Sequence, residues 1–278
     1  MTIYYSISSS HNMYRTKYDS FRSVGFKFGE PLIMAMDIGH GYLERDKKPE
    51  DESLDIESSK DMSDSLLFDC VDLCIRESSQ TCILGLNGCG KSTMLRLFAG
   101  LCGQPVRGKV QHAHNLKIGY FAQHIADEMI EQACCHYHEE CKKTVMECVT
   151  PLSMLQTMFS SKSEQDLRSE LTSFGLNPQK AIMDVSFLSG GERMRLCLAS
   201  MMLKDPHILI LDEPTTHLDL DSVEALIHVL KQWDGTVFMV SHDANFVRSL
   251  NADCFVISDK RLSHVPGGID TYLKAFSI

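Results

Sequence analysis

The stretch "GLNGCGKST" (85–93) fits the pattern G-x-x-x-x-G-K-[ST], in which a glycine-rich loop binds phosphate groups. The apolar run "TCILG" (81–85) predicts a buried strand before it, and "STMLRLFAG" (92–100) predicts a helix that begins near Ser92. Glycines let backbone N–H groups turn toward phosphate oxygens, and a helix N-terminus adds partial positive charge. The combination predicts a P-loop nucleotide site rather than a glycine turn that matches by chance.

The loop residues divide into phosphate ligands and a metal ligand. Lys91 is expected to neutralise the β- and γ-phosphates of ATP, and the hydroxyl of Ser92 is expected to bind Mg²⁺. The predicted nucleotide-binding residues of the loop are Gly85, Leu86, Asn87, Gly88, Cys89, Gly90, Lys91, Ser92 and Thr93.

A second acidic motif supports this prediction. In "ILILDEPTTHLDLDSVEAL" (208–226) a buried strand runs directly into Asp212 and Glu213. An unpaired buried carboxylate is costly, so either a cation lies there or the acids form a structural bridge or cap the next helix. With a P-loop in the same chain, Asp212 is predicted to hold Mg²⁺ and Glu213 to activate the attacking water.

Strands alternate with helices along most of the chain, which favours a parallel α/β core. Further strands are expected at 32–38, 68–75, 236–240 and 254–257, and a helix at 222–233. From 124 to 188 the strand signal stops and a helical stretch is expected.

The overall composition narrows the function classes. A net charge of −10 provides no global basic field for nucleic acid, although a local basic patch stays open. Eleven cysteines, an odd and irregularly spaced set, indicate reduced thiols in a cytoplasmic protein. No run is long and apolar enough for a membrane span, and no signal peptide is recognisable.

Three more motifs follow in a fixed order. "LSGGE" (188–192) opens a helix, so that Ser189, Gly190 and Gly191 can present donors to a phosphate. "YFAQH" places Gln123 at a strand end, and "VSHDANF" places His242 just beyond another strand.

Together these motifs resemble the nucleotide-binding cassette of an ABC ATPase, from about residue 32 to the C-terminus. The resemblance implies a P-loop NTPase fold with a mixed β core, an antiparallel β subdomain and an inserted helical subdomain. It also implies roles: Asp212 as the Walker B aspartate and metal ligand, Glu213 as the catalytic base, and His242 as the switch histidine. Gln123 would be a catalytic and metal-contacting residue of the Q-loop.

Two further positions follow from the same resemblance. Asp219 matches the D-loop aspartate. Tyr42 in "GHGY" aligns with the aromatic residue that stacks on adenine, although an ordinary strand-end aromatic is the alternative.

The details resemble the ABC-F branch, whose members act on the ribosome or in translation control. "DEPTTHLD" (212–219) is close to D-E-P-T-N-H-L-D of that branch, with Thr216 in place of asparagine. "FKFGEP" (26–31) and the late "GGIDTYLKAF" (267–276) look like the second cassette of such a protein. Ala244 departs from the arginine usual in the branch, and only one cassette is present.

The resulting organisation is an N-terminal extension (1–31), which could be the end of a linker that reaches toward tRNA, followed by the ATPase domain (32–278). That domain contains an acidic insertion at 44–64, with nine acids and four bases, that is expected to be disordered. A helical subdomain is expected at about 124–188.

The resemblance implies that two cassettes, as a homodimer or as halves of one protein, close head-to-tail on ATP and Mg²⁺. Two other functions stay open: the ATPase subunit of a membrane transporter, and a nucleotide-gated interaction module that does not hydrolyse ATP. Near 130–145, the Cys/His-rich "ACCHYHEEC" could bind zinc, but its spacing favours an ordinary polar loop.

Overall fold

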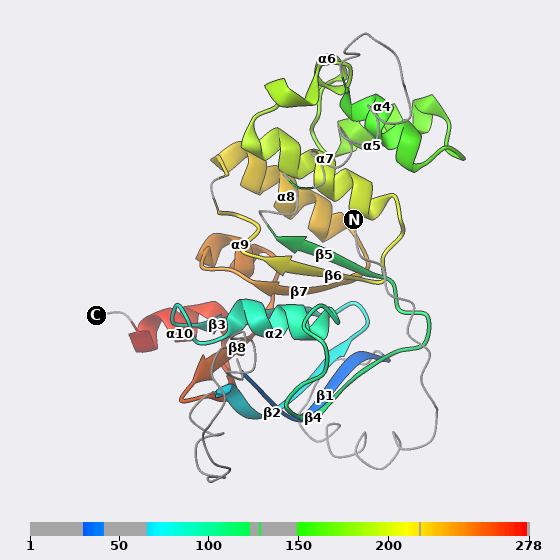
Figure 1. The fold of residues 1–278 in the computed structure, drawn as a ribbon. Helices are drawn as coiled ribbons and strands as arrows, with labels where there is room; N and C mark the ends of the chain where they lie inside the picture. The colour runs from blue at the N-terminus through cyan, green and yellow to red at the C-terminus, as the bar shows by residue number, and fades with distance from the viewer. Residues whose placement is uncertain (1–29, 42–65, 123–127, 129–148, 217, 277–278) are drawn as a thin grey trace, which may run out of the picture.

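A six-stranded sheet forms the centre of the molecule in the computed structural model, which describes residues 30–41, 66–122, 128, 149–216 and 218–276 (Figure 1). Its strand order is β5-β6-β7-β3-β8-β9, with β9 antiparallel to β8 and the other strands parallel. The strands are β3 (Gln80–Gly85), β5 (Ile118–Ala122), β6 (Ile208–Asp212), β7 (Thr236–Val240), β8 (Asp253–Ser258) and β9 (Arg261–His264).

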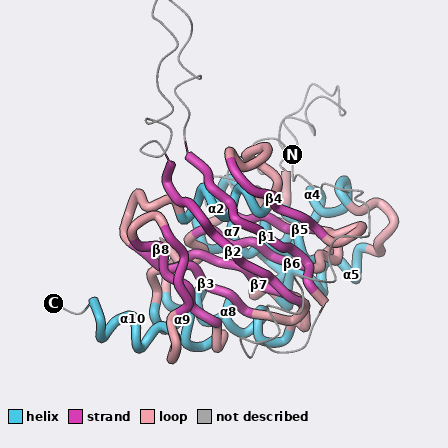
Figure 2. Tube along the Cα trace, turned by 90° about the horizontal axis from the view of Figure 1, so that it is seen from below, coloured by secondary structure: helices cyan, strands magenta, loops and turns pink. Residues whose placement is uncertain are grey.

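A second, antiparallel sheet has the order β2-β1-β4. It consists of β1 (Pro31–Gly41), β2 (Leu66–Arg76) and β4 (Arg107–His112). Figure 1 shows this sheet below the central strands, and in Figure 2, which is seen from below, it lies nearest the viewer. The helix α2 (Lys91–Phe98) lies between the two sheets, where its apolar residues enter one core with both of them (Figure 1).

The remaining helices pack mainly on the other face of the central sheet or at its edge. They are α4 (Pro151–Met158), α5 (Glu164–Ser173), α6 (Pro178–Ala181), the 3₁₀ turn η3 (Val185–Phe187), α7 (Gly190–Met202), α8 (Leu220–Gln232), α9 (Ala244–Ser249) and α10 (Gly268–Phe276). Figure 1 shows α4 to α8 above the sheet and α2 below it.

Alternate residues of each strand enter different cores. In β6, Ile208 and Ile210 face α2, whereas Leu209 and Leu211 face α7. Both faces of the sheet are covered, so the strands are almost continuously apolar, as parallel strands buried on two sides require. The same period of two decides which strand-end side chains point toward the phosphate loop.

The fold class implied by the sequence is confirmed: a mixed central sheet, an antiparallel β subdomain and helices inserted before the α7 region. Two strands were not predicted, β4 "RGKVQH" and β9 "RLSH". Both are edge strands that are largely exposed, so they lack the apolar signal on which strand prediction depends. The division of the chain into an extension and one ATPase domain stays a prediction.

Candidate functional site

The predicted site residues gather at one edge of the central sheet, because four neighbouring parallel strands end there. Gly85 ends β3, Asp212 ends β6, and Ser241 follows β7. Ala122 ends β5 and pairs in register with Asp212. Ligands of open parallel sheets bind beyond the carboxyl ends of the strands, which is where this sequence places its polar residues.

The phosphate loop between β3 and α2 requires glycine where the chain turns. Gly85 has φ +147°, and a Cβ there would lie 2.8 Å from the sulfur of Cys89 and 2.9 Å from the carbonyl oxygen of Ile257. Gly90 has φ +98° and caps α2, which begins at Lys91, one residue before the expected position. Substitution at either glycine would therefore displace the loop that leads into the helix.

Lys91 is the buried cation of this loop, with 8% of its surface exposed. Its ammonium donates hydrogen bonds to the carbonyl oxygens of Gly85 (3.0 Å) and Leu86 (2.9 Å). These neutral partners hold the side chain over the loop but bring no charge to balance it. The arrangement suits an anion at the N-terminus of α2.

Ser92 and Asp212 meet across the edge of the sheet. The Ser92 hydroxyl donates to Oδ1 of Asp212 at 2.9 Å, although 120 residues separate the two in sequence. The Tyr120 hydroxyl lies 3.5 Å from Oδ2 of the same carboxylate. Burial and the neighbouring Asp212 carboxylate raise the pKa of Tyr120, so the phenol remains a hydrogen-bond donor at neutral pH.

Glu213 has a backbone conformation that is unusual for a glutamate, with φ +48°. Its N–H donates to the carbonyl oxygen of Val240 at 3.0 Å, which ties the turn to the end of β7. Its carboxylate contacts His242 twice: Oε1 lies 3.3 Å from Nε2, and Oε2 accepts from the backbone N–H at 3.4 Å. The predicted base and the predicted switch histidine are therefore direct neighbours.

The alternative that these acids cap the next helix does not hold. Asp219 is the N-cap of α8, where its side chain accepts from the N–H of Ser222 at 2.9 Å. Hydrogen bonds from Ser222 hold the pKa of Asp219 below its usual range, so it is ionised at neutral pH.

The oxygen ligands at this edge suit a Mg²⁺ ion that binds together with a nucleotide. They do not suit a metal ion that is held by protein side chains alone. Within the described ranges, no group of three or more His, Cys, Asp or Glu side chains could hold a metal ion. Ser92 and Asp212 instead offer two hard oxygen ligands next to an anion-binding loop. Mg²⁺ in nucleotide sites typically takes few protein ligands and completes its octahedron with phosphate oxygens and water.

The signature segment begins α7. Ser189 is the N-cap, and its capping box with Glu192 uses the Ser189 N–H, which donates to Oε2 of Glu192 at 2.9 Å. Burial opposes ionisation of Glu192, but the hydrogen bonds from Ser189 and the ammonium of Lys180 outweigh it and lower its pKa. Gly190 faces open space, since a Cβ at this position would meet no atom within 4 Å. The start of the helix is therefore open at Gly190.

The starts of α7 and α8 lie side by side. Arg195 donates to the Ser222 hydroxyl at 2.8 Å and to the carbonyl oxygen of Gly175 at 3.2 Å. A Cβ on Gly191 would lie 2.5 Å from the Ser222 hydroxyl, so only glycine allows this approach. The signature and the D-loop aspartate therefore form one surface.

This surface and the phosphate loop belong to opposite faces of the central sheet. The apolar residues of α7 join the core above the sheet, whereas those of α2 join the core below it (Figure 1). One chain therefore does not bring Ser189, Gly190 and Gly191 onto the loop that contains Lys91.

Some predicted residues lie outside the described residues: Tyr42, Gln123 and the Cys/His-rich stretch 133–141. The acidic insertion 44–64 lies outside them as well.

Sequence reasoning missed Tyr120 as a site residue. It lies two residues before the end of β5, on the same side of the strand as Ala122, the register partner of Asp212. A polar-tipped aromatic residue in an otherwise apolar strand was the available signal.

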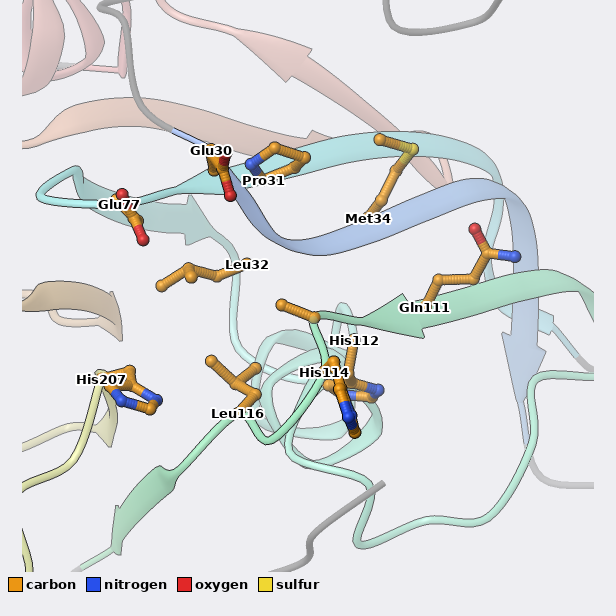
Figure 3. Close-up of a pocket in the computed structure, with 11 residues that line it drawn as sticks. Glu30, Pro31, Leu32, Met34, Glu77, Gln111, His112, His114, Leu116 and His207 are labelled. Atoms are coloured by element: carbon orange, nitrogen blue, oxygen red, sulfur yellow. The ribbon is translucent and has the colours of Figure 1, made fainter. Parts of the chain in front are cut away.

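A cavity of about 450 Å³ lies at the other end of the strands (Figure 3). Its lining includes Glu30, Glu77 and His207 together with the apolar Leu32 and Leu116. His207 precedes β6 and Asp212 ends it, so the strand separates the cavity from the acidic edge by about 17 Å. The cavity is therefore separate from the predicted phosphate site.

The fold and the edge residues define a P-loop nucleotide site, and comparison with known proteins identifies the family. Residues 68–216 match the family model described as ABC transporter. The chain belongs to this family, as an ATP-binding cassette.

Its relatives include members of sub-family F. ATP-binding cassette sub-family F member 3 of Rattus norvegicus is 38% identical over 195 residues, which cover 70% of this chain and 25% of that protein. Protein GCN20 of Saccharomyces cerevisiae is 30% identical over 257 residues, which cover 90% of this chain and 29% of that protein. The chain thus spans about a quarter of the length of these curated relatives.

A solved structure supports the fold. The dimeric post-hydrolysis state of the ATP-binding cassette MJ0796 bound to ADP and Pi matches with a TM-score of 0.58 and 21% identity, covering 85% of this chain and all of that one. Among the helices that the structure describes, none is both long and apolar enough to cross a membrane.

Proposed function

We propose that this chain binds ATP with Mg²⁺ and hydrolyses it together with a second cassette, as part of a cytoplasmic ABC-F-type protein that works on the ribosome or in translation control. One observation carries the chemistry: a buried ammonium, a Ser–Asp oxygen pair and a Glu–His pair meet at one edge of the sheet. Phosphoryl transfer needs mainly positioning and charge stabilisation, and these groups supply both.

Each group has a distinct task. Lys91 neutralises the phosphates from within the loop, and Ser92 with Asp212 holds the metal side. These two oxygen ligands would hold Mg²⁺, which would supply positive charge to the phosphates during the reaction. Glu213 orients and deprotonates the attacking water, and His242 holds the Glu213 carboxylate in place.

The second cassette is proposed because the signature and the phosphate loop lie on opposite faces of one chain. Three large apolar side chains next to the motifs are strongly exposed: Leu86 in the phosphate loop (74%), Phe187 before the signature (72%) and Leu220 after the D-loop aspartate (83%). We propose that a second copy covers these residues, with the phosphate loop of one copy against the signature of the other. Head-to-tail closure of two copies would cover all three.

Replacing Leu220 by glutamate tests this surface. We expect ATP binding to a single chain to persist, while turnover falls by about thirtyfold, since charging an apolar anchor of an interface costs about 2 kcal/mol. The measurement is ATPase rate against protein concentration. The matched control is Ile182→Glu, which makes the same change at an exposed side chain outside the motifs. Equal rates for the two variants at every concentration would contradict the dimer.

The translation role rests on the likeness to sub-family F and has its own test. Sedimentation of a nucleotide-trapped variant with ribosomes supports it. Isolation with a membrane partner instead would favour the transporter subunit, and ATP binding without turnover at any concentration would favour the interaction module.

A further inference from the structure

Tyr120 occupies a defined place beside the acidic strand end. In the β5–β6 pair, Tyr120 is the register partner of Ile210, and Ala122 is the partner of Asp212. Side chains two residues apart share one face of a strand. Tyr120 and Asp212 therefore point to the same side of the sheet, the side on which α2 presents Ser92.

The ring is fixed by packing. Tyr120 is 7% exposed and belongs to the core below the sheet, which includes Leu95 and Phe98 of α2. A buried aromatic ring of this kind places its hydroxyl within a narrow range of positions, and here that position is next to Oδ2 of Asp212.

We infer that Tyr120 is a positioning residue for Asp212: its hydroxyl holds Oδ2 while Ser92 holds Oδ1, so that the carboxylate keeps the orientation in which it can bind the nucleotide's divalent cation. The inference rests on the proposed function, because it assigns Tyr120 to the metal side of the same site. Two donors on two oxygens restrict rotation of the carboxylate more than a donor on one oxygen does.

Loss of the Tyr120 hydroxyl should affect binding of Mg²⁺ but not binding of ATP alone. Removing the hydroxyl leaves Lys91 and the loop unchanged, so affinity for ATP without a metal should not change. Only the gain in affinity that Mg²⁺ brings should decrease. A merely structural role would instead reduce stability and lower both affinities together.

The test compares Tyr120→Phe with the parent chain, using a fluorescent ATP analogue in EDTA and in a titration with Mg²⁺. We expect unchanged affinity in EDTA and about three- to tenfold more Mg²⁺ for half-maximal tightening, the effect of one hydrogen bond. The matched control is Thr236→Val, which removes a buried strand hydroxyl that donates to the carbonyl oxygen of Arg76 at the opposite sheet edge. Its Mg²⁺ requirement should equal that of the parent.

A double-mutant cycle that combines Tyr120→Phe with Asp212→Asn tests whether Tyr120 changes the Mg²⁺ requirement through Asp212 or by a general effect. If Tyr120 acts through that carboxylate, its removal adds nothing in the Asp212→Asn background. An unchanged Mg²⁺ requirement in Tyr120→Phe, or full additivity in the cycle, would overturn the inference. A parent chain that does not bind the analogue at all would refute the proposed function instead.

Discussion

Replacing Glu213 by glutamine should leave ATP binding intact and reduce hydrolysis by a factor of about 10² to 10⁴, the range that a general base supplies. The amide keeps the shape of the side chain and its hydrogen bond from the His242 N–H, but it cannot accept the proton of the attacking water. Because closure of two cassettes no longer ends in hydrolysis, the ATP-bound dimer should accumulate.

The measurement combines ATP turnover with the mass of the protein in solution, each with and without ATP and Mg²⁺. The control is Glu224→Gln, the same chemical change on an exposed residue of α8. Normal turnover in Glu213→Gln would show that another group activates the water. Loss of ATP binding in Glu213→Gln would show that the carboxylate has a structural task.

The backbone at Glu213 supports a functional task. A positive φ at a residue with a side chain costs about 1 to 3 kcal/mol and is retained where the surroundings enforce it. Here the N–H bond to Val240 enforces it and directs the carboxylate toward His242. The two neighbouring acids at the end of β6 thus have different partners: Ser92 for Asp212 and His242 for Glu213.

Local motifs made the core of the site predictable. The phosphate loop and the acidic strand end each follow an apolar run, so their places at the carboxyl edge follow from parallel strand order alone. The side-chain contacts that could not be predicted depend on the register between segments that are distant in the sequence. Contacts such as Tyr120 with Asp212, or Arg195 with Ser222, arise from the pairing of β5 with β6 and of α7 with α8.

Prediction from sequence was limited in the same way for the strands of the antiparallel sheet. β1 and β2 were predicted from their apolar residues, but β4 is recognised only through its pairing with β1. Edge strands with polar residues provide no periodic signal, and their structure is determined by the neighbour on which they align.

Replacing Lys91 by methionine should weaken ATP binding strongly. The thermal stability of the nucleotide-free chain should be at least as high as before. The ammonium contributes charge-assisted bonds to phosphates, and loss of about 3 kcal/mol corresponds to about a hundredfold weaker binding. In the free chain the same ammonium is buried against two neutral carbonyl oxygens, an arrangement in which an apolar side chain of similar length is tolerated or preferred.

The two effects have opposite signs, and this distinguishes a functional lysine from a structural one. Calorimetry with ATP and Mg²⁺ measures the first effect, and the thermal midpoint without nucleotide measures the second. Lys109→Met, on the exposed strand β4, is the control for the loss of one positive charge and should change neither quantity. A lower midpoint with retained ATP affinity would assign Lys91 to the folding of its loop, and the proposed phosphate site would then lose its cation.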